Sequence, residues 1–154
     1  MSTYASKTDV TSDKSRSEIE KTLSRYGATH FAYMSEPGAA KVAFQKEGRQ
    51  VRFKIPLPDP AAREFTHHSR GARTASAREQ IYEQACRQRW RALALVVKAK
   101  LEAVEAGISE FEQEFYAHTV LPSGRTVYEE TAESVATMIK TGMPGRLMLE
   151  GGAA

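Results

Sequence analysis

Apolar residues recur at intervals of three or four along one long segment of the chain, and this pattern limits the fold more than any other feature. At 100° per residue, residues with this spacing lie on a single stripe of an α-helix. The pattern predicts one helix over about 78–116, which at 1.5 Å per residue is roughly 60 Å long. Gly107 lies inside the segment and marks a point where such a helix bends or breaks. The stripe consists of Tyr82, Cys86, Trp90, Leu93, Val97, Leu101, Val104, Ile108, Phe111 and Phe115.

Upstream of this segment, apolar and polar residues alternate, which is the pattern of β-strands with one buried face. In VRFKI, Val51, Phe53 and Ile55 lie on one side of the strand, and Arg52 and Lys54 lie on the other. The sequences EPGAA and KEGRQ are turn and hairpin signals. We therefore expect a three-stranded antiparallel meander whose outer face is basic. The candidate strands are THFAYM (29–34), KVAFQ (41–45) and VRFKI (51–55).

Residues that cap helix N-termini indicate where the helices start. A serine or threonine that is followed three residues later by glutamate has the spacing of a capping box. Such pairs predict a first helix from about residue 15 to Gly27, the start of the long helix, and a C-terminal helix over about 127–141 that Gly142 ends. The pairs are Ser15–Glu18, Ser17–Glu20, Ser76–Glu79 and Thr126–Glu129.

Together these elements predict an α+β fold: a three-stranded antiparallel meander packed on one long helix, with short N- and C-terminal helices. Residues 15–145 form a single domain in this scheme. Residues 1–14 are polar and lack periodicity, so they predict a disordered lead-in. Residues 146–154 predict a flexible tail, and residues 61–75, which follow the strand-breaking PLPDPAA, predict a mobile basic loop.

Charge is distributed unevenly, although the net charge is only +3. Residues 51–100 carry 11 basic and 4 acidic residues, a net +7, whereas residues 101–154 carry 3 and 9, a net −6. The positive part attracts phosphate, and the negative part either repels it, pairs with the positive part or meets a basic partner. The chain has one cysteine and no apolar run of about 18 residues, and its N-terminus lacks the apolar segment of a secretory signal. We expect a cytoplasmic protein without a membrane span.

Basic residues fall into three groups that predict contacts to nucleic-acid phosphates. One group lies on the outer face of the sheet and, with Arg49, near the hairpin; one lies in the loop; and one forms a ridge on the long helix that spans about 40° of its surface. The alternative for the ridge is a solvated helix face, because Glu102 and Glu105 continue it. The alternative for the sheet is a charged face that discourages edge-to-edge aggregation. The three groups are Arg49, Arg52 and Lys54; Arg70 and Arg73; and Arg87, Arg91 and Lys98.

Other candidate chemistry is weak. Trp90 lies on the apolar stripe, which favours a core position over a role in base stacking. His67 and His68 are adjacent, and no third ligand has the spacing of a zinc site. Cys86 lies on the same stripe, whereas a reactive thiolate needs partial exposure. We therefore expect no catalytic residue, no metal and no cofactor, and a protein that is not an enzyme.

Several stretches resemble a small family of bacteriophage and prophage proteins of unknown function. The resemblance covers most of residues 17–145 and implies a setting rather than an activity. A weaker likeness, at the level of the fold alone, is to phage single-strand annealing proteins, in which a β-meander packs on a long helix beside a basic groove. The stretches that carry the family resemblance are RYGATHFAY, VAFQKEGRQVRFKIPLP, ACRQRWRALALVVKAKLEAVEAGI, EFEQEFYAH, LPSGRTV and the late GMP.

Two functions are favoured at this point, and an enzyme with an unrecognised site is the third and least favoured alternative. The first is a phage-type protein that binds nucleic acid, in particular single-stranded DNA, during DNA replication or recombination. The second is an interaction protein, either a subunit of a phage complex or a modulator of a host protein. The opposite charges of the middle and the end of the chain favour association with a protein partner or a second copy through the acidic C-terminal third.

Overall fold

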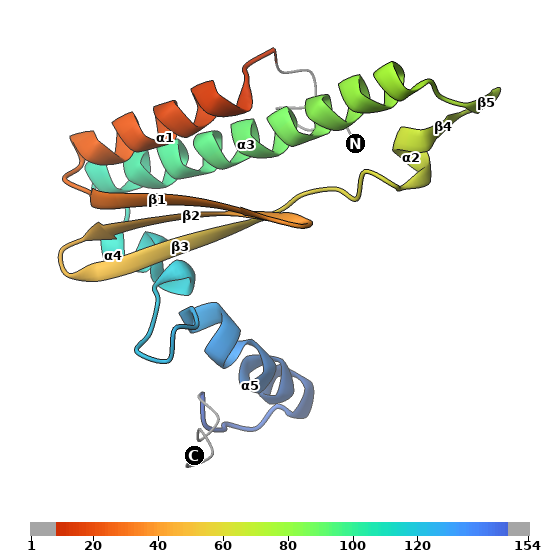
Figure 1. Ribbon diagram of the computed structural model, residues 1–154. Coiled ribbons are helices and arrows are strands. Elements are labelled where there is room, and N and C mark those ends of the chain that lie inside the picture. The colour runs from red at the N-terminus through yellow and green to blue at the C-terminus, as the bar shows by residue number, and fades with distance from the viewer. Residues whose placement is uncertain (1–8, 148–154) are drawn as a thin grey trace.

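The computed structural model describes residues 9–147 and has the α+β fold that the sequence predicts (Figure 1). A three-stranded antiparallel sheet of order β1-β2-β3 packs against the long helix α3. The elements are α1 (Ser12–Arg25), β1 (Thr29–Glu36), β2 (Ala39–Lys46), β3 (Arg49–Pro56), α2 (Arg63–Thr66), β4 (His67–His68), β5 (Gly71–Ala72), α3 (Ala75–Glu105), α4 (Phe111–Glu114), the 3-10 helix η1 (Tyr116–His118) and α5 (Val127–Thr141).

Helix α1 begins earlier than the capping pattern predicts. Its N-cap is Thr11, whose hydroxyl accepts a hydrogen bond from the Lys14 N–H at 3.2 Å. Ser15, the predicted cap, is instead buried inside the helix. Residues 12–14 therefore belong to the helix and not to the predicted lead-in, while residues 1–8 lie outside the described residues. The predicted end at Gly27 is confirmed, because its φ of +86° lets the chain leave the helix.

The sheet buries the side of β3 that the alternating pattern predicts. Val51, Phe53 and Ile55 are buried and lie opposite buried residues of β2, and Arg52 and Lys54 point to the other face. The β2–β3 hairpin turns at Glu47 and Gly48, which have φ of +52° and +75°. Two consecutive positive φ values are typical of the tight turn that matches the twist of antiparallel strands.

Helices α1 and α3 cover the apolar face of the sheet side by side (Figure 1). Their inward residues, Ile19 and Leu23 from α1 and Val97 and Leu101 from α3, form one core with β2 and β3. Trp90 is 5% exposed, so the prediction of a core tryptophan is confirmed. The Arg16 guanidinium lies 5.2 Å from the centroid of its ring. Because both helices lie on the apolar face, the opposite face of the sheet remains available to polar residues.

The prediction of one helix over 78–116 is wrong, because α3 ends at Glu105. Gly107 has φ of +72°, and the N–H groups of Gly107 and Ile108 donate to the carbonyls of Val104 and Ala103. This hydrogen-bond pattern is that of a Schellman motif, in which glycine ends the helix. Ile108, expected on the buried stripe, is 80% exposed. The N-cap also differs from the predicted Ser76, because Thr74 caps the helix.

The chain after Gly107 folds back onto the core through two aromatic residues. Phe111, in α4, and Phe115, directly after it, are buried against the sheet. Phe115 packs edge-on against Phe44 and Phe53, with ring centroids 5.9 and 6.1 Å apart. These two residues keep the spacing of the helical stripe, but they reach the core from a separate helix.

Helix α5 follows the predicted pattern at both ends. Thr126 and Glu129 form the predicted capping box, with hydrogen bonds of 2.9 and 3.2 Å. Gly142 ends the helix in the left-handed conformation, with φ of +66°. No residue of α5 is buried, and the helix extends away from the sheet (Figure 1). The predicted tail at 146–154 falls largely on residues 148–154, which lie outside the described part of the chain.

Candidate nucleic-acid interface

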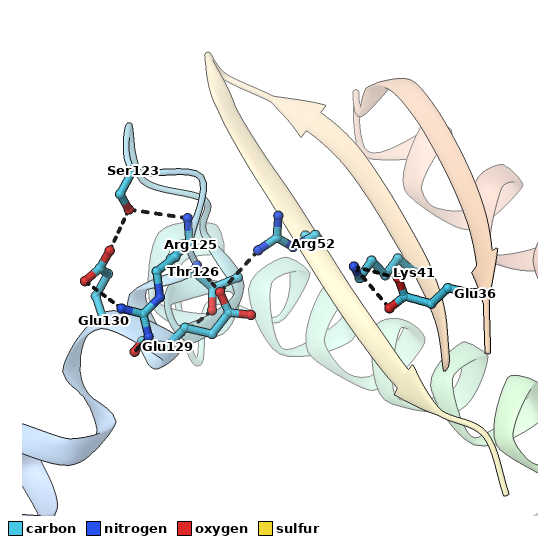
Figure 2. Close-up of polar contacts among 8 residues, drawn as sticks. All are labelled: Glu36, Lys41, Arg52, Ser123, Arg125, Thr126, Glu129 and Glu130. Atoms are coloured by element: carbon cyan, nitrogen blue, oxygen red, sulfur yellow. Dashed lines mark hydrogen bonds and ion pairs between the residues drawn. The ribbon is translucent and has the colours of Figure 1, made fainter. Parts of the chain in front are cut away.

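Two of the three cations in the first group of predicted phosphate contacts are already paired, and only Arg52 and Lys54 lie on the outer face of the sheet. Arg52 reaches from β3 to Glu129 at the start of α5, with 3.2 Å between nitrogen and oxygen (Figure 2). Arg49 lies on the other side of β3, two residues before the buried Val51, and pairs with Glu112 of α4 at 2.9 Å. Lys54 is exposed and forms no hydrogen bond or ion pair within residues 9–147. The acidic C-terminal third therefore neutralises part of the face that the sequence predicts to be basic.

A cleft of about 480 Å³ lies where this face meets α5. Arg52, Lys54, His118, Tyr128 and Glu129 line it. The His118 ring stacks on Phe53, with centroids 4.1 Å apart. Burial lowers the pKa of His118 below its ordinary value of 6.5, and the positive charge of Lys100 lowers it further. The imidazole is therefore neutral at pH 7, and the cations in the cleft come from β3 alone.

The ridge on α3 lies on a different layer of the molecule. Arg91 pairs with Glu18 of α1 at 2.6 Å, and Arg87 donates to the Gln84 side chain at 2.8 and 3.1 Å. Lys98 is exposed, with no hydrogen bond or ion pair in the described chain. Because α3 packs on the apolar face of the sheet, this ridge and the outer sheet face do not form one groove. Within the ridge, Arg91 links α3 to α1, so the ridge does not present three free cations.

The segment 61–75, predicted as a loop, contains the short helix α2 and the two-stranded hairpin β4–β5. The N–H of Arg73 donates to the Thr66 carbonyl, and its Nε donates to the His67 carbonyl at 3.1 Å. Arg73 thus holds the hairpin, while Arg70 is exposed on the hairpin. Phe65 is buried and packs edge-on against Tyr82 of α3, which fixes α2 to the long helix.

We name residues 63–89 the basic arm: α2, the β4–β5 hairpin and the first part of α3. It extends beyond the sheet at the end opposite α4 (Figure 1). It contains six arginines and three glutamates, a net +3. Within residues 9–147, none of these arginines forms an ion pair with a carboxylate. The arginines are Arg63, Arg70, Arg73, Arg78, Arg87 and Arg89. Arg63, Arg78 and Arg89 were not among the predicted phosphate contacts. Their exposure in the fold is what now identifies them as candidates.

The histidines and the cysteine that were weighed as metal ligands or nucleophile have other surroundings in the structure. In residues 9–147, no group of three or more His, Cys, Asp or Glu residues is placed to hold a metal ion. The Nδ1 atoms of His67 and His68 lie instead at hydrogen-bond distance from Thr66 Oγ1 and the Arg70 N–H. Burial raises the pKa of the Cys86 thiol above its ordinary value of 9.0, which disfavours the reactive thiolate.

Neither the described helices nor the comparisons with known proteins indicate a function. Among the helices of residues 9–147, none is both long and apolar enough to cross a lipid bilayer. Comparison of the chain with protein-family models, with curated proteins and with solved structures finds no match in any of the three. The resemblance to a phage family therefore stays a prediction, and a functional argument has to rest on the placement of charges and apolar surface.

Proposed function

We propose that this protein binds nucleic acid, without catalysing a reaction, through electrostatic contacts between the basic arm and phosphates. One observation supports this most: the arm holds six arginines without a carboxylate partner among the described residues, whereas Arg49, Arg52 and Arg91 have one each. Unpaired cations gain more from contact with phosphate, because they break no existing ion pair and release condensed counterions from the nucleic acid.

The proposed setting follows the family resemblance. We propose a small phage-type protein that acts in DNA replication or recombination in the cytoplasm of the host cell, on single-stranded DNA in particular. Contacts to phosphates carry no sequence information, so binding is expected to be largely independent of sequence. Arg70, Arg73 and Arg87 remain from our predicted contacts as members of the arm, with Lys54 and Lys98 as additional exposed cations.

The test is fluorescence polarisation with labelled single- and double-stranded oligonucleotides at several salt concentrations. Binding is expected at low salt, with affinity falling steeply as salt rises. The decisive variant is Arg63→Ala/Arg70→Ala/Arg78→Ala, because all three side chains are exposed and their removal breaks no hydrogen bond given by the structure. Each lost phosphate contact is expected to reduce the slope of log K against log salt by about 0.9 for duplex and about 0.7 for single strands.

A matched control removes three cations from elsewhere. Lys14→Ala/Lys21→Ala/Arg25→Ala changes the net charge equally, on the exposed face of α1. The control is expected to retain the wild-type salt slope. Absence of binding at about 50 mM salt would rule out the proposal. Equal loss in both variants would rule out the arm as the binding surface.

The alternative, an interaction protein of a phage complex or a modulator of a host protein, is favoured by a different observation. Helix α5 exposes Tyr128 and Ile139 to solvent, and exposed apolar residues on one helix face are typical of docking surfaces. Affinity capture from host lysate after nuclease treatment separates the two functions. A stoichiometric protein partner that survives nuclease and is lost in an Ile139→Glu variant would support the alternative.

A further inference from the structure

The cleft between β3 and the start of α5 contains one cation, Lys54, that is open to a ligand. Lys54 lies opposite Lys41 of β2, and Lys41 pairs with Glu36 at 3.2 Å between nitrogen and oxygen. Arg52, the other cation of the cleft, pairs with Glu129 (Figure 2). Lys54 is exposed and has no hydrogen bond or ion pair in the described part of the chain. A negatively charged ligand can therefore bind Lys54 without breaking an ion pair.

Two aromatic side chains line the same cleft and have free surfaces. The His118 ring is half-buried and stacks on Phe53, but its two nitrogen atoms form no hydrogen bond within residues 9–147. A neutral imidazole has one donor and one acceptor nitrogen, so both are left for solvent or a ligand. The Tyr128 ring is 64% exposed and stacks on no other ring among the described residues. The cleft thus combines a free cation, a free aromatic face and a donor–acceptor pair.

These three features limit the chemistry of a ligand. Arg52 and Lys54 against Glu129 leave a net charge of +1, because His118 is neutral, and a ligand with one negative charge neutralises it. The volume of about 480 Å³ lies within the range of about 300–1,000 Å³ that small-ligand sites have. The ring of Tyr128 fits a flat aromatic group, and the nitrogens of His118 fit a polar edge on that group. The matching ligand is an aromatic ring with donors and acceptors on its edge and a single negative charge beside it.

One nucleotide of a single strand has this combination. Its phosphodiester carries one negative charge, its base stacks on aromatic side chains, and the edge of the base forms hydrogen bonds. In a duplex the base is stacked and paired, so its face and its pairing edge are not accessible to a side chain. We infer that the cleft binds one unpaired nucleotide, with its phosphodiester at Lys54, its base on the ring of Tyr128 and the edge of the base at His118.

The inference rests on the proposed function and deepens it, because it names a contact that distinguishes single from double strands. Phosphate contacts of the basic arm serve both kinds of strand. The cleft shares no residue with the arm, and it lies on the face of the sheet opposite α3. Variants of the cleft are therefore expected to change the strand preference, whereas variants of the arm change the affinity for both.

A direct test of the cleft uses the thymidine dinucleotide TpT, which has two bases joined by a single phosphodiester. The full chain is titrated with TpT, and the side-chain proton signals of His118 are followed by nuclear magnetic resonance and assigned by their loss in His118→Phe. The signals are expected to shift until the site is saturated. The shift is expected to be lost in Tyr128→Ala and kept in Tyr128→Phe, which retains the ring. Benzoate has a ring and one negative charge but no polar ring edge, so it is expected to bind more weakly than TpT.

A second test measures strand preference by fluorescence polarisation, with one labelled oligonucleotide as a single strand and as a duplex. Tyr128→Ala is expected to weaken single-strand binding about fivefold or more and to change duplex binding less than about twofold, because only an unpaired base stacks on the ring. Lys54→Ala is expected to reduce the slope of log K against log salt for single strands by about 0.7. The matched controls are Tyr116→Ala, at an exposed tyrosine outside the cleft, and Lys21→Ala on α1, and both are expected to leave binding unchanged. Circular dichroism checks that each variant is folded.

Three outcomes would overturn the inference. His118 signals that do not respond to TpT show that no nucleotide enters the cleft. Benzoate that binds as tightly as TpT would assign the cleft to aromatic carboxylates instead. Equal weakening of single- and double-strand binding in Tyr128→Ala would exclude a contact with an unpaired base. The proposed function fails by a different result, the absence of oligonucleotide binding at about 50 mM salt. Binding that is lost in Arg63→Ala/Arg70→Ala/Arg78→Ala but unchanged in Tyr128→Ala would keep the arm as the binding surface and exclude the cleft.

Discussion

Phe115→Ala tests whether the segment after Gly107 is docked on the sheet as the structure shows. The Phe115 side chain is fully buried, and its ring stacks on Phe111 at 4.6 Å and meets Phe44 and Phe53 edge-on. Truncation of a buried phenylalanine to alanine costs about 3–5 kcal/mol, and an aromatic pair adds about 0.5–1.5 kcal/mol beyond its buried area. Because three aromatic contacts are lost together, we expect a loss of about 4–5 kcal/mol in the free energy of unfolding.

The assay is urea denaturation followed by circular dichroism and by the fluorescence of Trp90, the only tryptophan, which is buried in the same core. The neighbouring Tyr116→Ala is the control, because Tyr116 is 56% exposed and its truncation is expected to cost less than about 1 kcal/mol. Phe115→Leu keeps most of the volume and is expected to cost about 1.5 kcal/mol or less. A loss below about 1.5 kcal/mol for Phe115→Ala would show that the ring is not enclosed by the sheet, and the description of α4 as part of the core would then be wrong.

Three further predictions concern the segments around this contact. Burial lowers the pKa of His118, so as the pH falls through 6.5 the unfolded chain takes up a proton before the folded chain does. The free energy of unfolding is therefore retained above about pH 6.5 and declines below it. In urea titrations at several pH values His118→Phe should flatten this decline, whereas an unchanged slope would contradict the burial of His118. Gly107→Ala should destabilise the protein by about 1 kcal/mol in thermal denaturation, because Gly107 has a positive φ that alanine disfavours. A stabilisation of about 1 kcal/mol would instead indicate a continuous helix, which the structure excludes. Thr126→Ala removes the side-chain oxygen that caps α5 and should lower the stability of this helix by about 1 kcal/mol. Amide hydrogen exchange should become faster in α5 and stay unchanged in α3. An equal increase in exchange rate in both helices would contradict a local effect.

The elements of the fold that the sequence predicts well are those set by local patterns. The alternation in VRFKI determines which side of β3 is buried, and the core contains Val51, Phe53 and Ile55 as expected. The long apolar stripe also predicts α3 and the burial of Trp90. Helix ends were predicted less well, because several serines and threonines compete for the N-cap near each start. At Gly107 the same residue is compatible with a bend or with a stop, and only the fold of the following chain decides between them.

The candidate site could be predicted only in part, since its charges are paired over long sequence distances. Arg52 and Glu129 are 77 residues apart, and no local pattern brings them together. The uneven charge, +7 followed by −6, allowed pairing as one of three alternatives, and the structure shows such pairing at Arg49 and Arg52. The arginines of the basic arm are distinguished by what they lack, a carboxylate neighbour in the described chain. Such an absence can be recognised only once the fold is known.

The contact of α1 with α3 has a consequence for how quickly the chain folds. The meander needs only hairpins between neighbouring strands, which form on a microsecond timescale. The layer that covers it joins residues far apart in the chain, such as Glu18 and Arg91, which are separated by 73 positions. Closing a loop of this length costs conformational entropy before any packing is gained, so contacts of this kind slow folding. Formation of this helix pair on a preformed meander is therefore the expected rate-limiting step, and amides of the sheet should gain protection before those of α1.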